Sequence, residues 1–98
     1  MTITRLTNGM ELEVKVSGRL DTTTAPQLET ELKENIGNSE LLILDFSELE
    51  YLSSAGLRVI LAAQKIMNKQ GKMIVRNVNE TIMDIFDVTG FTDILTIE

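Results

Sequence analysis

The sequence predicts an α/β fold: a mostly parallel central sheet, an antiparallel hairpin strand at the N-terminus, and helices packed on the sheet. Three observations support this prediction. Strand-like runs alternate with helical patterns along most of the chain. An Asn8-Gly9 pair separates the first two strand-like runs, and residues 41–46 form an unbroken apolar stretch. Alternating strands and helices favour a parallel sheet, whereas Asn-Gly is typical of a tight hairpin turn.

The predicted strands differ in how their apolar residues are spaced. Residues 3–6 and 12–16 form the hairpin, and apolar and polar residues alternate strictly through the second of these runs. This period of two predicts one buried and one exposed face. The run at 41–46 lacks such alternation, so we expect a strand that is buried on both faces, as in the centre of a sheet flanked by helices. A further strand is expected at residues 73–75.

The first predicted helix begins near Thr24. Thr24 and Gln27 have the spacing of a capping box, and Pro26 is acceptable in a first helical turn. Gly37 is expected to end the helix. The inward stripe predicted from the helical period consists of Ala25, Leu28, Leu32 and Ile36.

Two more helices are expected in the second half of the chain. One runs from about Ser54 to Lys69 and ends before a glycine, with only a short polar link between it and the strand at 41–46. The other is capped by Asn79 and ends at Gly90. The tail at 91–97 fits either a short helix or a terminal strand, and both interpretations stay open.

Composition excludes several classes of function. A chain of 98 residues is expected to form one domain, residues 1–98. It contains no Cys and no His, so disulfides, zinc sites and most neutral-pH acid–base catalysis are not expected. The net charge of −6 argues against a nucleic-acid partner, and no apolar run is long enough for membrane insertion. We therefore expect no catalytic residue, no metal and no cofactor.

Two serines, Ser53 and Ser54, stand where the second long helix is expected to begin. A hydroxyl at that place lies beside free backbone N–H groups and the positive end of the helix dipole, where a phosphoryl group is tolerated. Ser54 has two interpretations from its position alone: it caps the helix, or it accepts a phosphoryl group. Ser53 is the alternative cap and the weaker candidate for modification.

Four segments around these serines form a recognisable set: Asp45-Phe46-Ser47, Ser53-Ser54-Ala55-Gly56-Leu57, Gly18-Arg19-Leu20-Asp21 and Thr24-Ala25-Pro26. Together they resemble the STAS domains of anti-sigma-factor antagonists. This resemblance extends over nearly the whole chain. The resemblance implies a STAS-like domain, which agrees with the α/β fold expected from the residues. Ser53 departs from the family pattern, because the family usually has Asp at that position.

The resemblance implies a phosphorylation switch at Ser54. A cytoplasmic protein of this family binds an anti-sigma factor that is a serine kinase, and it is released when that kinase phosphorylates the serine. A phosphatase then resets it. The partner-binding surface implied in this chain consists of Asp21, Ser53, Ser54, Gly56, Leu57 and Arg58.

Other interpretations stay open. Asp21 is equally well explained as a turn residue, and Gly56 by close packing inside the protein. A STAS domain can also be a cytoplasmic subunit of a transporter complex that does not switch. A nucleotide-binding module is a third hypothesis, although the chain has no glycine-rich phosphate loop. Self-association through an uncovered edge of the sheet is also possible.

Overall fold

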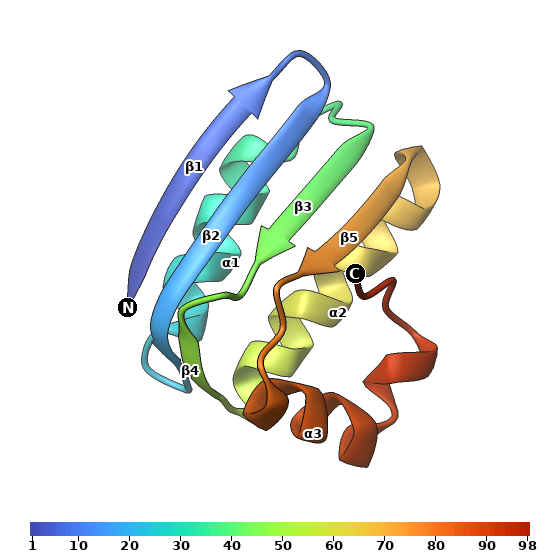
Figure 1. Ribbon diagram of the computed structural model, residues 1–98. Coiled ribbons are helices and arrows are strands. Elements are labelled where there is room, and N and C mark those ends of the chain that lie inside the picture. The colour runs from blue at the N-terminus through green and yellow to red at the C-terminus, as the bar shows by residue number, and fades with distance from the viewer.

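The computed structural model describes residues 1–98, and its sheet confirms the predicted class. In the four-strand path β1-β2-β3-β5, β1 is antiparallel to β2, whereas β2, β3 and β5 are parallel (Figure 1). A fifth strand, β4, pairs with the end of β2. The elements are β1 Thr2–Asn8, β2 Glu11–Leu20, α1 Ala25–Asn35, β3 Leu41–Asp45, β4 Leu49–Leu52, α2 Ser54–Gln70, β5 Lys72–Arg76, α3 Glu80–Thr89 and the short 3₁₀ helix η1 Phe91–Asp93.

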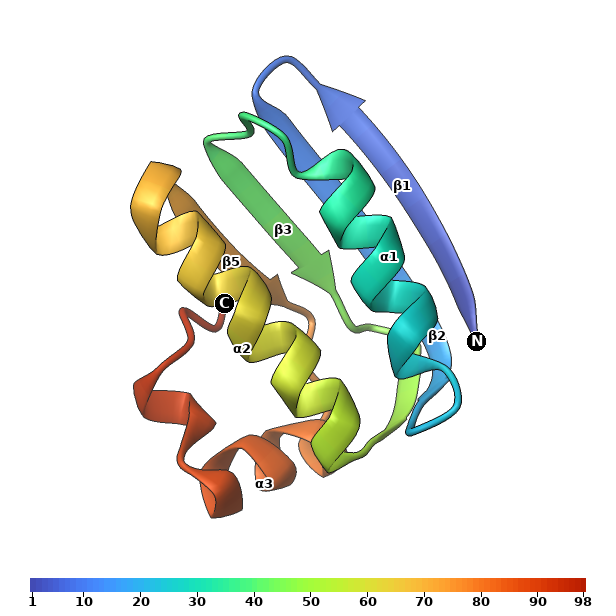
Figure 2. The ribbon, with the colours of Figure 1, turned by 180° about the vertical axis from the view of Figure 1, so that it is seen from behind.

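Helices α1 and α2 lie side by side on one face of the sheet (Figure 2). The alternating apolar residues of β2 point to this face, and the predicted inward stripe of α1 is buried against it. The core that forms between the two layers contains Leu12, Val14, Val16, Leu28, Leu42, Leu44, Ile60, Met67 and Val75. Helix α3 lies against β4 at one end of the sheet. None of the helices is both long and apolar enough to cross a bilayer.

The central strand β3 is buried on both faces, but not between two layers of helices. Leu42 and Leu44 belong to the core beneath the helices, whereas Ile43 points to the opposite face and is only 4% exposed. On that face an ion pair of 3.6 Å joins Glu13 of β2 to Arg76 of β5, across β3. Side chains of the neighbouring strands therefore cover Ile43, and the expected cover by helices is wrong for this face of the sheet.

Strand β4 was not predicted, because a polar link was expected in its place. Its burial pattern is in-out-out-in: Leu49 and Leu52 are buried, and Glu50 and Tyr51 are exposed. This pattern has no period of two because the pairing of β4 with β2 contains an irregularity between Gly18 and Arg19. The strand brings the chain back to the end of β2 immediately before α2.

The tail forms a short 3₁₀ helix, as one of the two interpretations expected, but only a single β-bridge in place of a terminal strand. After η1, Ile97 forms a parallel bridge with Val75, and the Glu98 N–H donates to the Val75 carbonyl at 2.9 Å. The tail therefore covers part of the outer edge of β5. The outer edge of β1 pairs with no other strand, and self-association through it stays a prediction.

Candidate functional site

The two serines and Asp21 lie at one end of the sheet, where β2 and β4 stop and the helices α1 and α2 begin (Figure 1). The two strands are parallel, so their following loops leave from the same edge. The Ser53 N–H donates to the Leu20 carbonyl at 2.9 Å. This bond joins the residue before Asp21 to the residue before Ser54, and so holds the two loops together.

Ser53, not Ser54, caps helix α2. The Ser53 hydroxyl oxygen accepts a hydrogen bond from the Gly56 N–H at 3.3 Å, and its carbonyl accepts one from the Leu57 N–H at 3.0 Å. Ser54 is the first residue of the helix and is exposed, and its hydroxyl makes no hydrogen bond within the chain. The capping interpretation of Ser54 is therefore wrong, and its hydroxyl is accessible to an incoming reagent.

Gly56 and Leu57 do not reach the surface, although both were expected on the partner-binding face. Both are buried in the first turn of α2. A Cβ atom on Gly56 would lie 2.7 Å from side-chain carbons of Leu20 and of Leu52. The glycine therefore lets the start of α2 pack closely on the ends of β2 and β4. These two residues position the serines and do not themselves line the exposed surface.

Asp21 organises the turn that precedes α1. Its Oδ1 accepts hydrogen bonds from the Thr23 hydroxyl at 2.8 Å and from the Thr23 and Thr24 N–H groups at 3.0 and 3.2 Å. The Thr23 hydroxyl, helped by these N–H groups, holds the pKa of Asp21 below its usual value. The turn interpretation of Asp21 is thus confirmed, and any contact with a partner would be additional to it.

The predicted capping box at the start of α1 is not formed. The Thr24 hydroxyl points back into the turn, where it accepts from the Asp21 N–H at 2.8 Å and donates to the Arg19 carbonyl at 2.9 Å. It makes no capping bond to the helix. The sequence spacing of Thr24 and Gln27 was compatible with a cap, but the turn around Asp21 uses the hydroxyl instead.

Arg19 and Tyr51 form a pair at the same end of the sheet that sequence reasoning missed. The Arg19 guanidinium lies 4.3 Å from the centre of the Tyr51 ring, and its Nε lies 3.8 Å from Asp21 Oδ2. Both side chains are exposed. The signal that could have found them is the pairing of β2 with β4, which places Arg19 opposite Tyr51.

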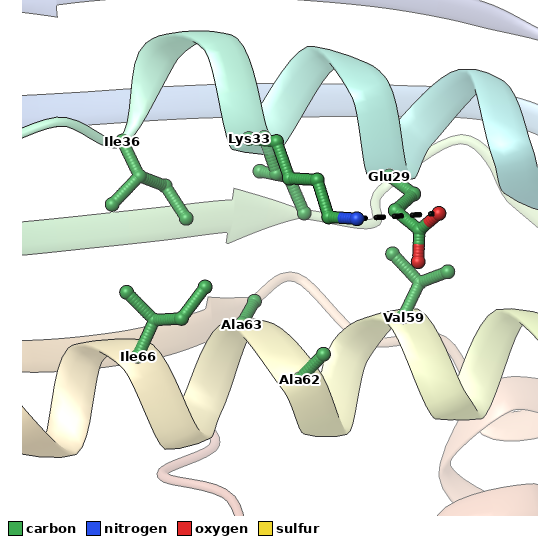
Figure 3. A pocket seen from close by; sticks show the side chains of 8 residues that line it. Glu29, Lys33, Ile36, Val59, Ala62, Ala63 and Ile66 are labelled. Atoms are coloured by element: carbon green, nitrogen blue, oxygen red, sulfur yellow. Dashed lines mark ion pairs between the residues drawn. The ribbon is translucent and has the colours of Figure 1, made fainter.

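A groove runs between α1 and α2. Figure 3 shows its walls: Ile36 on α1 faces Ile66 on α2, and Val59 on α2 lies opposite Glu29 on α1. The Lys33–Glu29 ion pair, at 3.8 Å, lies beside it. A second hollow shares Glu29 and Val59 with this groove and extends it to the start of both helices; its other lining residues are Thr22, Ala25, Pro26, Ala55 and Arg58.

Asp45, which belongs to one of the segments that carry the family resemblance, has a structural role at the end of β3. Its Oδ1 accepts from the Ser47 N–H at 2.9 Å, and its Oδ2 accepts from the Asn77 side-chain amide at 3.2 Å. Desolvation acts to raise the pKa of Asp45, but hydrogen bonds from Ser47 and Asn77, with the charge of Lys15, outweigh it and lower the pKa. The carboxylate thereby joins the turn before β4 to the segment before α3.

We expect the stabilising effect of Asp45 to depend on pH. Because its pKa is lower in the folded chain than in the unfolded chain, its contribution is complete above the unfolded value and decreases as pH falls through the folded value. As pH falls from about 5 through the lowered pKa of Asp45, the free energy of unfolding of Asp45→Asn should therefore approach that of the chain with Asp45. Urea titrations at several pH values measure this, and a constant difference between the two proteins would contradict it.

A family model described as STAS domain matches residues 2–98. The chain belongs to the STAS domain family. An anti-sigma F factor antagonist from Paenibacillus polymyxa is 34% identical over 89 residues, which cover 88% of this STAS domain chain and 76% of the relative. The anti-sigma-B factor antagonist of Bacillus subtilis is 30% identical over 91 residues, covering 92% and 84%.

Solved structures agree with this assignment. The crystal structure of an anti-sigma factor antagonist from Mycobacterium paratuberculosis has a TM-score of 0.89 to this STAS domain at 25% identity, and the match covers 98% of this chain and 83% of that one. The resemblance inferred from the sequence motifs is thus confirmed at the level of the family. The relatives are named as antagonists of other proteins, which is a regulatory role.

Proposed function

We propose that this STAS domain is an anti-sigma factor antagonist that is switched by phosphorylation of Ser54. In the unmodified state it binds an anti-sigma factor that is also a serine kinase, so that the sigma factor is free. The kinase then transfers the γ-phosphoryl group of ATP to the Ser54 oxygen, with release of ADP and the hydroxyl proton, and the complex separates. A phosphatase restores the serine. The observation that carries the proposal is the exposed, unbonded hydroxyl of Ser54 at the start of α2.

The comparisons support this role through the names of the relatives, two of which are antagonists of anti-sigma-B and anti-sigma F factors. We place the whole of residues 1–98 in one domain, and we place the protein in the cytoplasm, where its proposed partners act. In this proposal the chain is the substrate of a kinase and performs no catalysis itself. It requires no cofactor and no metal.

The contact surface that we propose surrounds Ser54 at the start of α2. Asp21, Ser53 and Arg58 contribute polar groups to it, since all three lie at or beside the ends of the loops that the Ser53–Leu20 hydrogen bond holds together. Gly56 and Leu57 are buried beneath this surface, and they determine how closely the first turn of α2 packs on the ends of β2 and β4. The exposed Arg19–Tyr51 pair lies on the same end of the sheet.

The switch follows from where the phosphate is placed. On the free protein a phosphate at the start of α2 lies near the positive end of the helix dipole, which favours it by about 0.3–1 kcal/mol. The fold should therefore tolerate it. In a complex the same group, with a charge of about −1.5 to −2, would be covered by the partner. An unmatched buried charge costs several kcal/mol, so the effect falls on binding and not on folding.

The proposal is tested by mixing the chain with an anti-sigma factor kinase and following the complex by size-exclusion chromatography. We expect a complex before ATP is added, separation after ATP, and a phosphate located on Ser54 by mass spectrometry. Ser54→Ala should form a complex that ATP does not separate, whereas Ser53→Ala should still be modified. If the complex of the chain that carries Ser54 persisted after ATP was added, the switch would be contradicted. That result would favour a transporter subunit that does not switch.

A further inference from the structure

Arg58 is a cation without an ionic partner, one helical turn from Ser54. The chain contains five ion pairs, and Arg58 takes part in none of them. Its side chain is exposed on α2 and lines the hollow that extends toward the start of α1. The carboxylate in that hollow is Glu29, which pairs with Lys33 on its own helix. The guanidinium is therefore free to bind another anion.

Helix geometry places Arg58 beside Ser54. Residues four apart on a helix are neighbours on its surface, with Cβ atoms about 5–6 Å apart. Long side chains on a helix also lean toward its N-terminus, so that Arg58 covers the surface above the preceding turn. The order is the favourable one, since an acidic group four residues before a basic one stabilises a helix better than the reverse. Both residues lie within α2, Ser54–Gln70, so this spacing holds.

We infer that Arg58 binds the phosphoryl group carried by Ser54, within the same chain. This inference rests on the proposed function, because it requires phosphate on Ser54. A guanidinium presents a planar fork of N–H donors that matches phosphate oxygens, and such charge-assisted hydrogen bonds are stronger than neutral ones. In the unmodified chain Arg58 stays available to the anti-sigma factor. In the phosphorylated chain it is occupied, so the partner meets an added negative charge and also loses a cation.

The test uses the full chain with phosphoserine incorporated at position 54 during synthesis, so that no kinase is needed. Phosphorylation should raise the urea midpoint of unfolding, and the increase should be smaller in Arg58→Gln by about 0.2–0.3 M. Lys65→Gln is the matched control, since Lys65 is exposed further along the same helix and its loss changes the net charge equally. The control should retain the full increase.

A second readout distinguishes a direct contact from a general effect on stability. In the phosphorylated chain that retains Arg58, the phosphate should titrate at a lower pH than in phosphorylated Arg58→Gln, because a neighbouring cation favours the dianion. ³¹P NMR follows both titrations. Glu29, which lines the hollow with Arg58, and the Arg19–Asp21 pair at the end of β2 are unchanged in both proteins. Equal titrations in Arg58→Gln and Lys65→Gln, or equal shifts of their urea midpoints, would overturn the inference. Neither result would depend on whether a kinase recognises Ser54.

Discussion

Ser54→Asp is expected to weaken binding of the anti-sigma factor by about a hundredfold or more, whereas Ser54→Ala should bind as well as the unmodified chain. The Ser54 hydroxyl is exposed and makes no internal hydrogen bond, so its removal disturbs nothing in the free protein. A carboxylate at the same place would add a negative charge where the partner docks, and it would compete for Arg58, the cation that is otherwise available to the partner. A penalty of about 2.7 kcal/mol already reduces affinity a hundredfold. Calorimetric titration of the kinase with each variant measures the effect.

The control for this prediction separates charge at the site from charge in general. Thr30→Asp adds the same charge at an exposed position in the middle of α1, and it should leave binding within a few-fold of the unmodified chain. Ser54→Asp should also unfold at the same urea concentration as the unmodified chain or slightly above it, since an acidic residue suits the first turn of a helix. If Ser54→Asp and Ser54→Ala bound equally well, no switch could reside at this position.

Gly71→Ala is expected to lower the free energy of unfolding by about 3 kcal/mol or more. A Cβ atom on Gly71 would lie 2.0 Å from the backbone oxygen of Glu40 and 2.6 Å from its carbonyl carbon. Backbone atoms cannot turn aside as a side chain can, so the two segments must separate. Their separation would also strain the hydrogen bond that the Lys72 N–H donates to the Glu40 carbonyl at 2.9 Å. Thermal unfolding should show a decrease in Tm of roughly 12 °C or more.

Gly56→Ala provides the matched comparison, because it makes the same chemical change at another crowded glycine. There the new methyl group would meet the side chains of Leu20 and Leu52, which can shift more readily than backbone atoms although both are buried. Alanine also favours a helix over glycine by about 0.5–1 kcal/mol, which offsets part of the penalty. We therefore expect a smaller loss of stability for Gly56→Ala than for Gly71→Ala. The reverse order would show that the crossing at Glu40 is less tight than described.

Local patterns predicted most of the elements. The expected limits of α2, Ser54 to Lys69, differ from the observed helix by one residue, and Asn79 caps α3 through a hydrogen bond from the Ile82 N–H as its position indicated. Gly90 ends α3 with a positive φ of 80°. Each of these features depends on residues within one or two turns of each other, so their information is contained in a short window of sequence.

Features that depend on contacts distant in sequence were not predictable in the same way. Gly71 ends α2 as its position indicated, but its φ of 173° is extended, and the glycine is needed because Glu40 passes close to it. Strand β4 forms only because the end of β2 is available for pairing. Both residues 53 and 54 are serines, and both positions suited a helix cap. Which of them caps α2 depends on where the packed helix begins and therefore on which N–H groups are free.

The separate tasks of Ser53 and Ser54 have a consequence for the life of the protein in a cell. Ser53 caps the helix whether or not Ser54 is modified, so phosphorylation should not lower the resistance of the chain to unfolding or to the proteases that attack unfolded chains. Switching the protein off would then not deplete it, and only the active share would rise and fall. A response built this way can be reversed without new synthesis or degradation.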